Sequence, residues 1–197
     1  MNYVLIAIGE IPSHIKYTVN TILSVEEDPN IFLCTDRKID FKYKNLNNIN
    51  LKDVSSKNIE YVKSLKIFNN TIFESNPLWE SSLLRVFYLE SLKKYLGINS
   101  FVHFDNDVLI YKNFNQVKNN LVNSKFNITP ASEKLCIFGY SYIHDVEPIN
   151  LINKKIIETA EFGIKHNWKF NYGKPFNEMS FLGTIQKDYQ ELFNLLP

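Results

Sequence analysis

Apolar residues at the start of the chain first form a continuous run and then recur at helical spacing. Residues 3–8 (Tyr-Val-Leu-Ile-Ala-Ile) are uninterrupted by charge and end at Gly9, which is typical of a parallel strand covered on both faces. Ser13 is a candidate N-cap for the helix that follows. The apolar face of that helix consists of Ile15, Val19, Ile22 and Leu23. The pattern predicts a strand followed by a helix.

The same alternation continues along the chain. Further strands are predicted at residues 31–34, 101–104, 126–129 and 135–138, and a weaker one at 59–62. Helices are predicted over residues 79–96, 150–165 and 178–195. Gly97 stands where the longest helix needs a C-terminal glycine. Strands that alternate with helices favour an α/β fold with an open, mostly parallel central sheet flanked by helices.

Composition narrows the functional classes. The 197 residues match one ordinary domain, and 45% of them are hydrophobic, which is ample for a core. The 22 basic and 21 acidic residues give a net charge of +1, which offers no basic surface for nucleic acid. No apolar run approaches the ~20 residues of a transmembrane segment, and the first residues lack the basic flank of a signal peptide. Cys34 and Cys136 lie in strand-like runs, so we expect buried, reduced thiols in a cytoplasmic protein.

Two carboxylates directly follow the predicted strand at residues 101–104. In an extended chain the side chains of Asp105 and Asp107 point the same way, so both can face one hard cation such as Mn²⁺ or Mg²⁺. A cation held there would stabilise charge on a departing nucleoside diphosphate. Ligands of open α/β sheets bind at the carboxyl ends of strands, which supports this interpretation. Ordinary turn chemistry for Asp105-Asn106-Asp107 is the alternative.

The surroundings of this pair resemble a known family. Residues 79–85 (Trp-Glu-Ser-Ser-Leu-Leu-Arg), the helix they begin, and residues 101–111 (Phe-Val-His-Phe-Asp-Asn-Asp-Val-Leu-Ile-Tyr) resemble the core of the GT-A glycosyltransferases. The likeness is greatest to the family 8 group of glycogenin and the bacterial lipopolysaccharide galactosyltransferases. In that group an Arg-bearing helix precedes a strand similar to "YLDxDVLV".

The resemblance implies a single Rossmann-like GT-A catalytic domain over residues 1–197. Residues 1–112 would form the nucleotide-sugar-binding half and residues 113–197 the acceptor-side half. Asp105 and Asp107 would hold the metal, and Asp105 and Asn106 would bind the donor.

This sequence departs from the family 8 pattern at the third metal ligand. It is a late histidine in a His-x-x-Gly-x-x-Lys-Pro element, whereas here Gly173-Lys174-Pro175 follows His166 at the wrong spacing. We therefore expect either a metal with fewer protein ligands or a domain truncated at its C-terminal end.

Two charged residues are further candidates. Arg85 lies in an apolar stretch, so we expect it to be enclosed and to need an anion, either a metal-bound diphosphate or a nearby carboxylate. By resemblance it lies against the donor; a solvated helix residue is the alternative. By resemblance, Glu178 at the start of the last helix is the catalytic carboxylate at the reaction centre. The helix dipole alone also favours an acid there.

The ends of the first two strands are weaker candidates. By resemblance, Ala7, Ile8 and Gly9 receive the nucleotide base of the donor. Asp36 ends the second strand in a similar place and can accept a hydrogen bond from the base or ribose. Both Gly9 and Asp36 can equally be turn residues.

These features predict a metal-dependent glycosyltransferase that moves a sugar from a nucleotide-sugar donor, a UDP-sugar first of all, to a saccharide, lipid-linked or protein acceptor. One alternative is a catalytically inactive nucleotide-binding domain of the same fold. The other is a nucleotidyltransferase-type α/β enzyme, which is disfavoured because no glycine-rich, lysine-containing phosphate loop follows the first strand.

Overall fold

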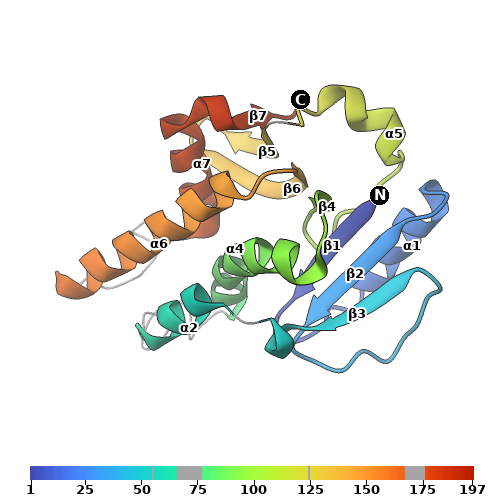
Figure 1. The fold of residues 1–197 in the computed structure, drawn as a ribbon, viewed down its shortest axis with the longest axis horizontal. Coiled ribbons are helices and arrows are strands. Elements are labelled where there is room, and N and C mark those ends of the chain that lie inside the picture. Colours follow the sequence, from blue (N-terminus) through green and yellow to red (C-terminus); the bar gives the residue numbers. More distant parts are fainter. Residues whose placement is uncertain (55, 66–76, 124, 167–175) are drawn as a thin grey trace.

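A seven-stranded sheet forms the centre of the protein in a computed structural model that describes residues 1–54, 56–65, 77–123, 125–166 and 176–197 (Figure 1). The strands are β1 (Asn2–Ala7), β2 (Asn30–Thr35), β3 (Leu46–Asn50), β4 (Phe101–His103), β5 (Phe126–Ser132), β6 (Leu135–Ile143) and β7 (Phe193–Leu195). Their order across the sheet is β3-β2-β1-β4-β6-β5-β7. β1 to β4 are parallel, β6 is antiparallel to both β4 and β5, and β7 is parallel to β5. Among the described strands, β6 alone therefore runs against the others.

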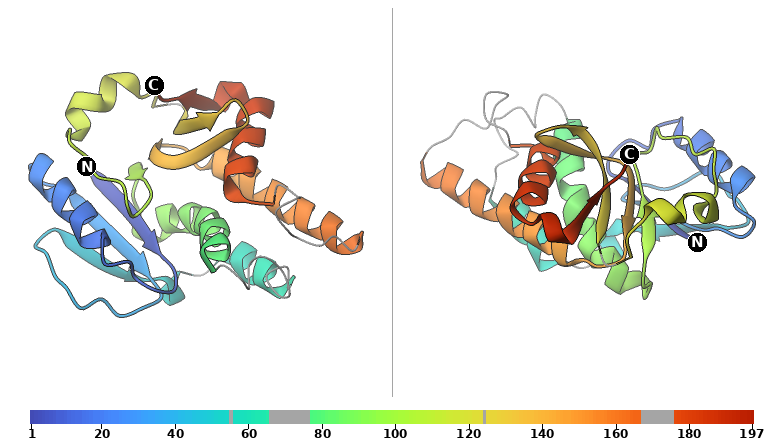
Figure 2. Two further views of the ribbon diagram at one scale, coloured as in Figure 1. Left: turned by 180° about the vertical axis from the view of Figure 1, so that it is seen from behind. Right: turned by 90° about the horizontal axis from the view of Figure 1, so that it is seen from above.

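Helices cover both faces of this sheet. They are α1 (Ile15–Val25), α2 (Lys57–Ser64), α4 (Pro77–Leu96), α5 (Phe114–Val117), α6 (Glu147–Lys165) and α7 (Glu178–Asp188), with short 3-10 turns at Leu51–Asp53, Lys118–Asn120 and Gln190–Leu192. Leu5 of β1 belongs to the core under α1, whereas its neighbours Val4 and Ile6 belong to the core under α2, α4, α6 and α7. Figure 2 shows α1 beside β1 and β2, away from α4, α6 and α7. Because both faces of β1 are buried, its sequence has no polar alternation.

The predicted arrangement of the first strands is confirmed. β1 pairs in parallel with β2 on one side and with β4 on the other, in the registers Ala7 to Thr35 and Val4 to His103. The carboxyl ends of all three strands therefore lie at one edge of the sheet, where the chain continues into Gly9, Asp36 and Asp105. Both cysteines are buried free thiols, as predicted. None of the described helices has the length and apolar character needed to cross a membrane.

The end of α4 is also as predicted. Gly97 has a φ of +64°, a conformation that glycine adopts without strain. The backbone N–H of Ile98 donates to the oxygen of Lys93, and that of Gly97 donates to the oxygen of Lys94, both at 3.3 Å. This is the hydrogen-bond pattern of a Schellman motif.

The weak strand prediction at residues 59–62 is wrong, because these residues lie in α2. The Ser56 hydroxyl accepts from the backbone N–H of Ile59 and caps the helix, and the buried residues Ile59 and Val62 are three apart, which is helical spacing. The strand next to β2 is instead β3, whose sequence Leu-Asn-Asn-Ile-Asn has little apolar character.

Other boundaries also differ from the predictions. The helix expected over residues 178–195 ends at Asp188, and Phe193–Leu195 form the edge strand β7 on β5. α1 begins at Ile15 after His14, so Ser13 is not its N-cap. β5 and β6 extend to Ser132 and Ile143, beyond the apolar runs that predicted them. The strand boundaries follow from backbone pairing of β5, β6 and β7, which leaves little trace in apolar periodicity.

Gly183 permits close contact between α7 and the β5–β6 turn, and its replacement should destabilise the fold. A Cβ there would collide with the backbone oxygen of Lys134, so Gly183→Ala should lower the free energy of unfolding by about 1–3 kcal/mol. Thr184→Ala, at an exposed neighbouring position, should change it by less than about 0.5 kcal/mol. Urea unfolding followed by fluorescence measures both, and equal stability of the two variants would contradict the contact.

His103 in β4 is a buried histidine that stays neutral. Its Nδ1 lies 2.7 Å from the backbone oxygen of Val4, which only accepts, so Nδ1 carries the proton. Burial and then the positive charge of Arg85 lower the pKa of His103 to about 3, although the hydrogen bond to Val4 acts in the opposite direction.

Acid should therefore destabilise the fold through His103. The unfolded chain has the ordinary histidine pKa of about 6.5, so between that pH and about 3 only the unfolded state binds this proton. Stability should fall as the pH drops through this window, by up to about 1.4 kcal/mol per pH unit. Urea unfolding between about pH 6.5 and 5, above most carboxylate titration, should show a steeper loss for the wild type than for His103→Gln. An equal loss of stability with falling pH in the wild type and in His103→Gln would contradict this role of His103.

Candidate active site

A cavity of about 760 Å³ lies at the sheet edge where β1 and β4 end. It brings together most of the residues singled out from the sequence: Ala7, Ile8, Arg85, Asp105, Asn106, Asp107 and Glu178. These residues come from the end of β1, from α4, from the loop after β4 and from the first turn of α7. The cavity thus has the location that open α/β sheets use for ligands.

The loop after β4 is a turn and not an extended continuation of the strand. β4 ends at His103, and the backbone N–H of Val108 donates to the oxygen of Asp105 at 3.1 Å. The premise that Asp105 and Asp107 share one side of an extended chain is therefore wrong. Both residues nevertheless line the same cavity, Asp107 exposed and Asp105 partly buried.

Asn106 fixes this loop against its neighbours. Its Nδ2 donates to the backbone oxygen of Ile6 at 2.8 Å, and its own backbone oxygen accepts from the Thr18 hydroxyl at 2.6 Å. The loop is thereby tied to β1 and to α1. Asn106 Oδ1 is buried and has no hydrogen-bond partner among the described residues.

Arg85 is enclosed, as predicted, and its anions are carboxylates. Its Nη1 donates to Asp105 Oδ1 and its Nη2 to Glu178 Oε1, while its guanidinium lies 4.9 Å from the centre of the Phe138 ring. Only 9% of the residue is exposed. Burial alone would lower the pKa of Arg85, but the charges of Glu178 and Asp105 outweigh it and raise the pKa. The sequence allowed either a metal-bound diphosphate or a nearby carboxylate as the anion of Arg85. In the described residues, carboxylates take this role.

Glu178 is held at the start of α7. The Asn177 side chain accepts from the backbone N–H of Ser180 at 2.9 Å and caps the helix. Glu178 stands in the first turn, where the helix dipole favours a negative charge, and is 7% exposed. The ion pair with Arg85 joins residues 93 positions apart and aims the carboxylate at the cavity.

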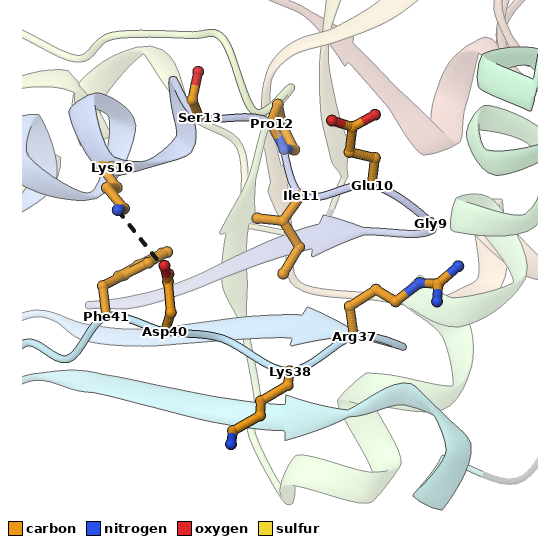
Figure 3. Close-up of a pocket in the computed structure, with 10 residues that line it drawn as sticks. All are labelled: Gly9, Glu10, Ile11, Pro12, Ser13, Lys16, Arg37, Lys38, Asp40 and Phe41. Atoms are coloured by element: carbon orange, nitrogen blue, oxygen red, sulfur yellow. Dashed lines mark ion pairs between the residues drawn. The ribbon is translucent and has the colours of Figure 1, made fainter.

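A second hollow of about 550 Å³ adjoins the first, at the ends of β1 and β2 (Figure 3). The two share Glu10, Pro12 and Ser13. Gly9, with a φ of +83°, lines this hollow, and its backbone N–H donates to Asp36 Oδ1 at 2.8 Å. Asp36 therefore secures the turn after β1 and is not a lining residue of either hollow.

Basic residues that the sequence reasoning missed line this second hollow. They are Lys16, Arg37 and Lys38. Figure 3 shows Lys16 facing Asp40, with 4.0 Å between Nζ and Oδ1, and Arg37 extending to the same side of the view as Gly9. Arg37 and Lys38 directly follow Asp36 at the end of β2, so the rule that singled out Asp36 also indicates them.

Other missed residues line the first cavity, chiefly on the first turns of α4. They are Leu78, Trp79, Ser81 and Ser82, together with Met179 on α7. Ser81 and Ser82 precede Arg85 by four and three residues, so they share its helix face. That spacing is the signal that could have found them.

The residues present fit a divalent cation whose coordination shell is supplied partly by the protein and partly by a bound substrate. Among the described residues no group of three or more His, Cys, Asp or Glu is arranged to hold a metal ion. The cavity does offer the carboxylates of Asp105 and Asp107. Mg²⁺-type sites in phosphate-binding proteins use one or two carboxylates, and phosphate oxygens and water complete the shell. His166 is exposed at the end of α6, and residues 173–175 lie outside the described part of the chain.

Comparison of the sequence finds no matching protein-family model and no matching curated protein. Comparison of the fold does find similar solved structures. The glycosyltransferase GlyE of Streptococcus pneumoniae TIGR4 has a TM-score of 0.59 at 11% identity, over 99% of this chain and 44% of that one. Mouse xyloside xylosyltransferase 1 has a TM-score of 0.59 at 12% identity, over 100% and 85% of the two chains. The galactosyltransferase LgtC, solved with donor and acceptor sugar analogues, has a TM-score of 0.57 at 9% identity, over 99% and 73%.

These similarities establish the fold. The chain spans less than half the length of the pneumococcal protein and most of the length of the other two. Identities of 9% to 12% carry the architecture and not the substrates. The protein has the GT-A fold of glycosyltransferases, with the mostly parallel central sheet and flanking helices expected of it.

Proposed function

We propose that the protein transfers a sugar from a nucleotide-sugar donor, with Mn²⁺ or Mg²⁺ held by Asp105 and Asp107. The observation that carries the proposal is that Asp105, Asp107, Arg85 and Glu178 line one cavity at the carboxyl ends of β1 and β4. These are the positions expected for metal, donor and reaction-centre residues in a GT-A fold. A UDP-sugar is the first donor to test, and a saccharide, a lipid-linked sugar or a protein the acceptor.

The two adjoining hollows support a division of the donor between them. The nucleoside would lie where the two hollows meet at the end of β1, against Ala7 and Ile8 of the first cavity and Gly9 of the second, and the diphosphate in the first cavity beside the loop after β4. The sugar would then reach Arg85 and Glu178. A divalent cation bound there would neutralise charge on the departing nucleoside diphosphate.

The protein's own groups would position the reacting sugar. The Arg85 ion pair orients the Glu178 carboxylate, and Asn106 and Thr18 hold the loop that carries Asp105. Preorganised groups of this kind lower a reaction barrier because they need not reorganise during the reaction.

A screen of nucleotide sugars with Mn²⁺ tests the proposal first. A donor present at 100 times its dissociation constant should stabilise the fold by about 2.7 kcal/mol, which thermal unfolding detects. Slow hydrolysis of that donor with Mn²⁺ should then separate an enzyme from an inactive binding domain of the same fold.

Loss of one aspartate should abolish turnover. Asp107→Asn keeps the shape of the side chain but removes a charged metal ligand, so donor hydrolysis should fall about 100-fold or more. The unfolding temperature of this variant without metal should be equal to or slightly above that of the wild type, because repulsion between like charges is relieved. Excess chelator should stop the wild type, and added Mn²⁺ should restore it. Asp188→Asn, at the exposed end of α7, is the matched control. Normal turnover by Asp107→Asn, or by the wild type in chelator, would refute the metal site.

A change of Arg85 to lysine should weaken donor binding. Lysine keeps the charge but loses the planar fork that reaches Asp105 and Glu178 together. We expect the dissociation constant for the nucleotide sugar to rise about tenfold or more, a loss of about 1.4 kcal/mol. Calorimetric titration measures it. If Arg85→Lys binds the donor as the wild type does, Arg85 is a structural residue only.

A further inference from the structure

We propose that Arg85 competes with the divalent cation for Asp105, so that the donor-free protein binds the cation weakly and the donor strengthens that binding. This inference rests on the metal site of the proposed function. It concerns a different property, namely what sets the affinity of that site.

The ion pairs place Arg85 where it can compete. The guanidinium donates one hydrogen bond to Asp105 Oδ1 and another to Glu178 Oε1. The Arg85 and Glu178 side chains are 11% and 9% exposed, while that of Asp105 is 35% exposed. Of the two carboxylates that pair with Arg85, that of Asp105 is the more exposed, so it is the more accessible to a divalent cation in the cavity.

Charge in this part of the cavity is only partly compensated. Four carboxylates, those of Glu10, Asp105, Asp107 and Glu178, line the cavity together with the guanidinium of Arg85, which pairs with two of them, Asp105 and Glu178. A divalent cation bound to Asp105 would be attracted by the carboxylates but repelled by the positive charge of Arg85. Even at the dielectric constant of water, a single and a double positive charge about 5 Å apart repel enough to change an affinity about tenfold.

Glu178 makes an exchange of partners feasible. A buried guanidinium that loses its only anion is strongly destabilised. Arg85 has two anions, so it keeps Glu178 if Asp105 turns to the cation. The pair with Glu178 is the more buried of the two, and it would remain.

Cooperative binding of donor and cation follows from this competition. The diphosphate of a donor adds negative charge and oxygen ligands beside Asp105, which offset the effect of Arg85. The donor should therefore raise the affinity for the cation, and by linkage the cation should raise the affinity for the donor by the same factor.

Direct measurement of Mn²⁺ binding without donor tests the competition. Electron paramagnetic resonance of free Mn²⁺ gives the affinity of the wild type, Arg85→Gln, Glu178→Gln and the double variant. Arg85→Gln should bind Mn²⁺ about tenfold or more tightly than the wild type, even though it loses activity. Glu178→Gln should bind more weakly, because Arg85 is then held by Asp105 alone.

The double variant separates competition from a simple count of charges. It loses one carboxylate and one guanidinium, so its net charge equals that of the wild type. Competition predicts tighter Mn²⁺ binding than the wild type, because Asp105 is released. The double variant also removes both buried charges together, so it should fold even if Arg85→Gln alone does not.

Two outcomes would overturn the inference, and they can be told apart. If the wild type binds Mn²⁺ through Asp107, as shown by loss of binding in Asp107→Asn, but neither the double variant nor a folded Arg85→Gln binds it more tightly, the inference alone is wrong. If the wild type and the Arg85 variants all fail to bind Mn²⁺, the metal site of the proposed function is rejected and the inference with it.

Discussion

The buried guanidinium of Arg85 is the interaction on which the geometry of the cavity depends. It joins α4, the loop after β4 and the first turn of α7, which are otherwise far apart along the chain. Charges enclosed in this way are held together by the cost of separating them, since removal of one partner from a buried ion pair typically destabilises a protein by about 3–5 kcal/mol. The relative positions of Asp105 and Glu178 are therefore fixed by electrostatics as much as by apolar packing.

The sheet provides the frame within which this ion pair forms. Parallel pairing of β2, β1 and β4 brings three chain segments to one edge, and the Thr18 hydroxyl and the Asn106 side chain fasten the loop after β4 to α1 and β1. Antiparallel β6 then places Phe138 beneath the guanidinium. A site assembled on strands and helix ends is better defined than one carried by long loops.

How much of this could be read from the sequence depended on burial. Continuous apolar runs identified β1, β2 and β4, because both faces of those strands are covered. β3 escaped notice because its asparagines are exposed, and residues 59–62 misled because two buried residues three apart also fit a short apolar strand. For the site, Asp105, Asp107, Arg85 and Glu178 could be singled out one by one. That Arg85 would pair with Glu178, 93 residues away, depends on how the chain folds back and could not be derived from spacing.

Helix α7, which carries Glu178, also contacts the turn of the β5–β6 hairpin. Five residues after Glu178, Gly183 lies so close to Lys134 in the β5–β6 turn that no side chain fits between them. Tight turns at a protein surface usually accept insertions freely. This turn is constrained on the side that faces α7, because its backbone already fills the space that a side chain at position 183 would need. The packing of a surface turn is thereby linked, through α7, to the position of Glu178 in a cavity that the turn does not line.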